Sequence, residues 1–185
     1  QDRIYLLFFL FFSLILIFSM RIVHVSLKKI DISNVNSLKK SWTYRNGFVP
    51  TTKNNSQVIP IFTGSSIITS SVDGYLISLD PGSGFEKWRL KLPKPVAKRG
   101  MTFLEKEKII LATTGKGVFA INEINGKINK DFGNKGIFGN SLSLVSPIYN
   151  SRTVYVAFRS KIESFFLTNG KKKWSFDLNG ARVWS

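Results

Sequence analysis

The chain has 185 residues, a formal net charge of +16 and no cysteine. This length suits one ordinary domain or a part of a larger one. Without cysteine the chain can form neither disulfides nor thiolate metal sites, and it lacks the cysteine that anchors a lipoprotein. The excess positive charge comes mainly from scattered lysines. No basic helix and no RNA-binding aromatic motif accompanies them, so we expect no nucleic acid partner.

An uncharged apolar run extends from Ile4 to Met20. At about 1.5 Å per residue, a helix over this run reaches the short end of the length that crosses a bilayer. No small-residue cleavage site follows Met20, which favours an uncleaved anchor over a cleaved signal peptide. We therefore predict a transmembrane anchor over residues 1–24, with membrane lipid as its partner. Basic residues on its C-terminal side would by themselves put that side in the cytoplasm, so its orientation stays open.

Beyond residue 40 the apolar pattern indicates short β-strands. Strand-like runs alternate with Gly, Asn, Asp and Pro, and turn signals such as Asp73-Gly74 and Asn125-Gly126 separate them. The runs form three sets, which are VIPIF, SIITSS and YLISLD; KIILATT and GVFAIN; and SPIY, TVYVAF and IESFFL. The sequence therefore predicts an all-β domain.

The three sets repeat one another with a period in the low forties. The repeated turn contains Gly84, Gly126 and Gly170. A similar spacing relates Trp42, Trp88 and Trp174, with Lys130 in the intermediate slot. A period of about 40–45 residues with four short strands per unit is typical of propeller blades. We expect these tryptophans to dock against neighbouring blades, which is a structural role.

Only about three blades fit into the chain, whereas propellers typically have about four to eight. The sequence begins with Gln1 and stops at Trp184-Ser185, within an unfinished unit. We therefore expect a fragment of a longer protein, with residues 41–185 forming an incomplete set of blades.

Five segments resemble the quinoprotein alcohol and glucose dehydrogenases, which use pyrroloquinoline quinone (PQQ). They are Ile32–Gly47, similar to the motif that leads into the first blade; Gln57–Pro60, similar to a short motif before a strand; Lys98–Met101, similar to an "RG" element; Asn125–Gly136, similar to a "TGK…FG..G" excursion; and Gly180–Trp184, similar to a "GG-x-x-W" element. They occur in the family's order and at about its spacing.

The resemblance implies an eight-bladed β-propeller, of which this chain holds about three blades behind one transmembrane helix. Its parts would be the anchor (1–24), a linker with the N-terminal motif (25–40) and the blades (41–185). The implied function is a membrane-anchored, PQQ-dependent dehydrogenase that oxidises an alcohol or sugar and passes electrons to a quinone or cytochrome. The implied location is the bacterial inner membrane, with the propeller in the periplasm.

The resemblance also implies cofactor-binding roles for three residues. A flat polyanionic quinone needs cations for its carboxylates and an aromatic face for its rings. Arg99 matches the carboxylate clamp, Trp184 the floor under the rings, and Gln57 the cofactor rim. The structural alternatives are a surface Arg before a Gly turn, another blade-docking Trp and an ordinary polar residue. The base Asp is expected beyond residue 185, so no catalytic residue is assigned within the chain.

The metal chemistry of the family is only partly reflected here. Calcium or another metal is expected beside PQQ, but no metal ligand is assigned in this chain. Where the family carries a "GSSGAE"-like loop with a calcium-binding Glu, this sequence reads Ala157–Lys161, and Glu163 falls in the next strand. This departure leaves an alternative function open, a non-catalytic propeller scaffold such as one used in outer-membrane protein assembly. Asp73, Asp80, Glu105 and Glu107 are interpreted as turn and surface charges.

Overall fold

The computed structural model describes residues 30, 32–47 and 58–183. The chain divides into two compact units, residues 1–39 and 40–185. In the first unit, one turn of 3₁₀-helix spans Val35–Ser37, and the Ser37 hydroxyl donates to the Asn34 carbonyl at 2.7 Å. Within the described residues no helix is long and apolar enough to cross a membrane. The predicted anchor, residues 1–24, lies outside the described residues.

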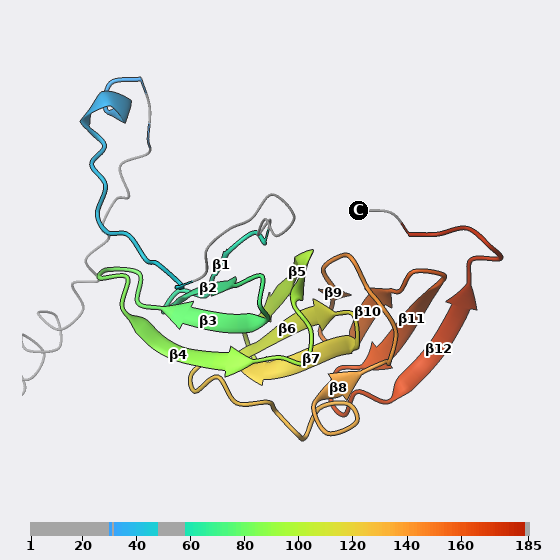
Figure 1. The fold of residues 1–185 in the computed structure, drawn as a ribbon. Helices are drawn as coiled ribbons and strands as arrows, with labels where there is room; N and C mark the ends of the chain where they lie inside the picture. The colour runs from blue at the N-terminus through green and yellow to red at the C-terminus, as the bar shows by residue number, and fades with distance from the viewer. Residues whose placement is uncertain (1–29, 31, 48–57, 184–185) are drawn as a thin grey trace, which may run out of the picture. The chain divides into compact units, whose positions relative to one another are not determined.

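The second unit contains three four-stranded antiparallel sheets, here called blades 1, 2 and 3 (Figure 1). Blade 1 consists of β1 (Ile61–Phe62), β2 (Ile67–Ser70), β3 (Tyr75–Leu79) and β4 (Glu86–Lys91). Blade 2 consists of β5 (Val96–Leu104), β6 (Ile109–Thr114), β7 (Gly117–Asn122) and β8 (Ile137–Phe138). Blade 3 consists of β9 (Ile148–Tyr149), β10 (Thr153–Ala157), β11 (Lys161–Phe166) and β12 (Lys172–Asp177). Each sheet joins strands consecutive in sequence, so the predicted all-β class and its three repeats are confirmed.

Polar side chains shape the repeated turn between the third and fourth strands. The Asp80 carboxylate accepts from the Ser83 hydroxyl at 2.7 Å and from the backbone N–H groups of Gly82 and Ser83. In blade 2, the Asn122 side-chain oxygen accepts from the backbone N–H groups of Ile124 and Asn125. These local bonds offer the backbone a turn in place of a longer strand. Asp80 is therefore a turn residue, as its sequence context predicted.

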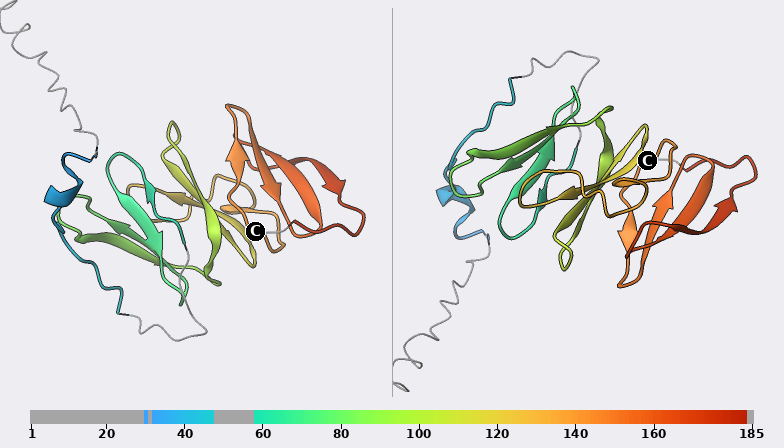
Figure 2. Two further views of the ribbon diagram at one scale, coloured as in Figure 1. Left: turned by 90° about the horizontal axis from the view of Figure 1, so that it is seen from above. Right: turned by 90° about the horizontal axis from the view of Figure 1, so that it is seen from below.

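Apolar side chains pack between successive blades, which stand side by side in sequence order (Figure 2). One buried cluster joins Ile68 and Leu76 of blade 1 to Ile110 and Phe119 of blade 2. Every residue of β6 is buried, because blade 2 is covered on both faces. A second cluster, between blades 2 and 3, includes Leu111, Val118, Phe138, Val154, Val156 and Phe165. Each blade is thus a thin sheet stabilised by its neighbours, as in other repeat architectures.

Tryptophan joins blade 1 to blade 2 as the repeat predicted. The Trp88 indole N–H donates to the Glu123 carbonyl at 2.8 Å. Its ring lies so close to Gly126 that a Cβ there would be 2.5 Å from Trp88 Cδ2. Trp42 makes the same joint with the Gly84 turn of blade 1, donating to the Pro81 carbonyl at 3.0 Å. The docking role is confirmed for both tryptophans.

The joint between blades 2 and 3 is different. Lys130 stands in the repeat where the other units have Trp88 and Trp174. The residue that lies against the next turn is Gly133, whose backbone is so close that a Cβ on Gly170 would lie 2.1 Å from Gly133 Cα. The excursion that carries Gly133 also brings Phe132 against Phe138, with ring centroids 6.2 Å apart. The excursion lies before β8, so counting from the other repeats leads to Lys130 and not to Gly133.

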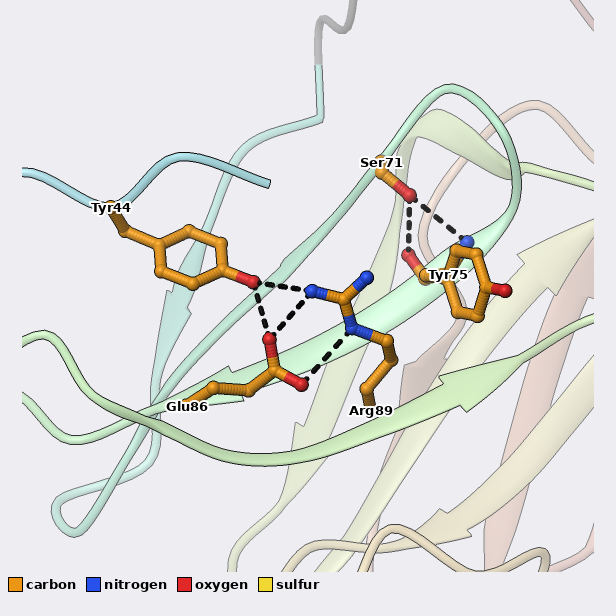
Figure 3. Close-up of polar contacts among 5 residues, drawn as sticks. All are labelled: Tyr44, Ser71, Tyr75, Glu86 and Arg89. Atoms are coloured by element: carbon orange, nitrogen blue, oxygen red, sulfur yellow. Dashed lines mark hydrogen bonds and ion pairs between the residues drawn. The ribbon is translucent and has the colours of Figure 1, made fainter. Parts of the chain in front are cut away.

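The first residues of the second unit, 40–47, are held to blade 1 by a polar network (Figure 3) and by Trp42. The Tyr44 hydroxyl donates to Glu86 Oε2 at 2.5 Å and accepts from Arg89 Nη2 at 2.9 Å. Arg89 also makes a two-point contact with the Glu86 carboxylate, at 2.7 and 3.0 Å. The hydrogen bonds from Arg89 keep the pKa of Glu86 below the ordinary value. This ion pair is about one-third exposed, so its contribution to stability is modest.

The face of blade 3 that points away from blade 2 is apolar and exposed. On β12, Trp174 is 44% exposed and Phe176 60% exposed. Trp174 lies beside Tyr155, with ring centroids 6.2 Å apart. Among the described residues no sheet covers this face, although Trp174 holds the position from which Trp88 docks onto the next blade.

Candidate cofactor-binding site

The first strands of the blades lie close together on one side of the second unit. Strand β1 contacts β5, and the Arg99 backbone on β5 forms a parallel bridge with Val145, just before β9. The fourth strands, β4, β8 and β12, form the opposite rim (Figure 1). This radial order, with inner strands converging and outer strands apart, defines the axial side of a propeller.

Arg99 lies on this axial side, within β5. The pairing of β5 with β6 is interrupted between Val96 and Met101, which are paired with Thr114 and Ala112 respectively. The residues between them, 97–100, form a wide bulge. Arg99 is exposed there, and among the described residues no carboxylate forms an ion pair with its guanidinium. Its five N–H donors therefore have no carboxylate partner among the described residues.

Hydroxyl groups hold the backbone of this bulge. Ser146 Oγ donates to the Arg99 carbonyl at 2.6 Å. Thr113 Oγ1, on a fully buried residue of β6, lies 2.8 Å from the Gly100 carbonyl and 3.3 Å from the Val145 carbonyl. These contacts join the bulge of blade 2 to the segment that leads into blade 3.

Gly100 must be glycine for the bulge to close. A Cβ at this position would lie 2.1 Å from Thr113 Oγ1 and 2.9 Å from the Ala97 Cβ. The clash is with a buried side chain that has its own hydrogen bond, so it cannot be relieved cheaply. The "RG" pair is therefore one unit, in which Gly100 allows the close approach and Arg99 presents the cation.

Of the three predicted cofactor residues, the structure describes only Arg99. It lies within a strand, at a bulge, and not at a turn. Gln57 and Trp184 lie outside the described residues. Thr113 and Ser146 were not singled out from the sequence. The available signal for Thr113 was a hydroxyl near the end of the apolar run KIILATT, one residue before the buried strand ends.

Glu163 lies in β11, as its sequence context predicted, and only 3% of it is exposed. Lys161 Nζ is 2.8 Å and Lys172 Nζ 3.4 Å from its Oε1. Burial raises the pKa of Glu163, but the hydrogen bond and charge of Lys161 and the charge of Lys172 outweigh it, and the pKa lies below the ordinary value. The carboxylate is thus ionised and already paired with lysines.

A polar cavity of about 630 Å³ opens beside Glu163. Lysine and asparagine side chains line it, namely Lys116, Asn134, Asn140, Lys161 and Lys172. No group of three or more His, Cys, Asp or Glu side chains that could hold a metal occurs among the described residues. A metal at this cavity would have to compete with two lysines for a single carboxylate.

Comparison with known proteins identifies the class. The family model for the β-propeller domain of glucose/ethanol/alcohol dehydrogenases, named PQQ, matches residues 21–143. The chain belongs to this family.

Two curated relatives are quinoprotein glucose dehydrogenases. The one from Escherichia coli (strain K12) is 27% identical over 198 residues, covering 82% of this chain and 25% of the relative. Quinoprotein glucose dehydrogenase A of Acinetobacter calcoaceticus is 26% identical over 209 residues, covering 84% of this chain and 26% of the relative. The chain thus spans about a quarter of the length of these relatives.

Solved structures share the fold. A europium-containing methanol dehydrogenase superposes with a TM-score of 0.62 at 16% identity, over 80% of this chain and 28% of that one. The computationally designed Ika4 protein superposes with a TM-score of 0.55 at 12% identity, over 67% of this chain and 74% of that one. At these identities the likeness concerns the arrangement of the blades alone.

Proposed function

We propose that this chain is part of a PQQ-dependent dehydrogenase that oxidises the hydroxyl group of an alcohol or a sugar. The observation that carries this proposal is the Arg99 guanidinium, presented on the axial side by a bulge that only glycine at position 100 allows. Membership of the PQQ family and the relatedness to two quinoprotein glucose dehydrogenases support it. Because the chain spans about a quarter of those relatives, the activity belongs to the full-length protein.

The described residues fit one part of the cofactor. PQQ carries carboxylates, and an arginine without a carboxylate partner can bind one of them through two parallel N–H···O bonds. When bound, PQQ supplies the two-electron acceptor for conversion of a CH–OH group to a carbonyl. Arg99 would orient the cofactor from one edge. Trp184 as the floor and Gln57 at the rim complete the proposed site, and calcium or another metal would take its ligands from outside the described residues.

The test uses the full-length protein with added PQQ and Ca²⁺ and an artificial dye as electron acceptor, across a panel of alcohols and sugars. We expect PQQ-dependent dye reduction. Arg99→Ala should weaken PQQ binding about ten- to a hundredfold, as removal of a charge-assisted hydrogen-bonded pair does. Lys98→Ala, an exposed cation next to it, is the matched control and should bind PQQ normally. Dye reduction that does not depend on PQQ would contradict the proposal.

The proposed whole protein is an eight-bladed ring with an N-terminal membrane anchor at residues 1–24. The exposed Trp174 face supports further blades after blade 3. The proposed location is the bacterial inner membrane, with the propeller in the periplasm and electrons passing to a quinone or cytochrome. Fractionation of membranes, followed by protease treatment of spheroplasts, tests the anchor and its orientation.

One observation favours a second candidate, a non-catalytic propeller scaffold for protein–protein interaction, such as in outer-membrane protein assembly. In the region where dehydrogenases of the family carry a calcium-binding loop, this chain has Lys161 and Lys172 paired with Glu163. A scaffold would take up no PQQ and would need none for its stability. Quenching of tryptophan fluorescence by PQQ separates the two, since only the dehydrogenase is expected to show saturable quenching.

A further inference from the structure

We propose that Thr113 and Ser146 are positioning residues for the cofactor clamp, because their hydroxyls fix the backbone that carries Arg99. This inference rests on the proposed PQQ site and deepens it. Neither residue is expected to touch the cofactor.

The bulge that carries Arg99 has no ladder pairing with β6. Ladder partners on β6 exist for Val96 and for Met101, and the four residues between them face the single residue Thr113. An exposed arginine on such a bulge would sample many backbone positions unless other contacts fixed it. Three contacts hold it, which are the backbone bridge between Arg99 and Val145 and the hydrogen bonds from Thr113 to Gly100 and from Ser146 to Arg99.

The hydroxyls that contact the bulge come from two different blades. Thr113 belongs to β6 of blade 2, whereas Ser146 precedes β9 of blade 3. Thr113 Oγ1 also lies within reach of the Val145 carbonyl, so one hydroxyl lies between the two backbones. The backbone position of Arg99 therefore depends on how blades 2 and 3 are joined.

Thr113 is fully buried. It is 0% exposed and continues a strand of apolar residues, where valine would fit the same volume. A buried hydroxyl costs free energy unless it is hydrogen-bonded. Thr113 is bonded to the backbone of the bulge, so its hydroxyl has a specific use at this place.

The experiment compares PQQ binding and steady-state kinetics of Thr113→Val, Ser146→Ala and Thr113→Ser with the unaltered full-length protein. Binding is followed by quenching of tryptophan fluorescence, and the KM for PQQ is separated from kcat at saturating PQQ. We expect Thr113→Val and Ser146→Ala each to raise the Kd for PQQ about tenfold, the effect of one lost hydrogen bond in the clamp. At saturating PQQ, kcat should stay within about twofold, and Thr113→Ser should restore normal binding.

Thr114→Val is the matched control. Thr114 is also fully buried on β6, but its hydroxyl bonds to Gly117 and Lys116 in the β6–β7 turn, not to the bulge. It should bind PQQ normally. Normal binding by Thr113→Val, or an equal loss in Thr114→Val, would overturn the inference while leaving the proposed function intact. No binding by the unaltered protein would overturn the proposed function and the inference together.

Discussion

At the scale of single residues, Glu163 shows what a buried charge contributes in this fold. It occupies a middle-strand position where blades 1 and 2 carry the buried apolar residues Ile77 and Phe119. Removing one partner of a buried ion pair is costly because it leaves the other charge without compensation. Lys161 and Lys172 are partly exposed, so solvent screens part of this cost.

Glu163→Gln should reduce the free energy of unfolding by about 1–3 kcal/mol at neutral pH. The folded-state pKa of Glu163 lies below the ordinary value of 4.5, so the unfolded chain binds more protons. The stabilisation is therefore present above pH 4.5 and is lost as the pH falls through the folded-state pKa. Urea unfolding of the full-length protein should show a shallower acid loss for Glu163→Gln than for the unaltered protein. Asp131→Asn, at an exposed site, is the control, and parallel curves for all three proteins would refute this role.

Gly126→Ala should destabilise the protein by about 1–3 kcal/mol, because the new methyl group would overlap the Trp88 ring and the backbone there has a φ of +69°. Gly115→Ala is the matched control, since the nearest atom to its new Cβ is 3.9 Å away. Denaturation midpoints of the two variants compare the positions directly. Equal midpoints would show that the tryptophan joint tolerates a side chain.

At the scale of elements, the segment 40–47 is held by two contacts of unequal strength. The Trp42 ring is packed on Gly84 and its N–H is bonded, whereas Tyr44 takes part in an exposed network with Glu86 and Arg89. Apolar packing of a large ring contributes more to stability than an exposed polar network.

Trp42→Ala should therefore release this segment, with a loss of about 2–4 kcal/mol in unfolding free energy and faster cleavage after Arg45 by trypsin. Tyr44→Phe, which removes only the hydroxyl, should cost less than about 1 kcal/mol and leave the cleavage rate nearly unchanged. Limited proteolysis followed by mass spectrometry measures both. Similar cleavage rates for the two variants would show that the polar network is the main attachment.

Most strands could be predicted from the sequence because their apolar runs are bounded by Gly, Asn and Asp turns. The run SPIY contains the two-residue strand β9, but none of the predicted runs covers β5 or β8. β8 has only two residues, too few to show a period of two. Gly133 was missed for a different reason. Its docking contact is between backbones, and no side-chain pattern marks it. Arg99 was predicted as a cofactor residue through the family resemblance. Thr113 and Ser146 were not, because their hydrogen bonds to Val145 and Arg99 join different blades, where sequence spacing gives no guide.

At the scale of the whole molecule, the blades bury their faces in pairs, so an uncovered face exposes apolar surface. Blade 3 exposes Phe176 and Trp174 on its outward side. Burying one such ring is worth about 1.5–3 kcal/mol.

A protein made of residues 40–185 alone should therefore self-associate through this face. Phe176→Lys should weaken the association about tenfold or more, as measured by sedimentation velocity over a concentration series. Phe85→Lys is the control, because Phe85 is 78% exposed on a turn of blade 1. A monomer at all concentrations, or equal weakening by both variants, would contradict a role for the outward face.

The tryptophan joints also determine the order in which the blades can pack during synthesis on the ribosome. The Trp42 indole bonds to a carbonyl 39 residues later in the chain, and the Trp88 indole to one 35 residues later. Each joint can therefore close only after the next repeat has emerged. At about 5–20 residues per second, each newly made blade waits roughly 2–8 s with its indole uncovered. Each joint therefore closes in chain order, so an uncovered indole marks the most recently made blade during synthesis.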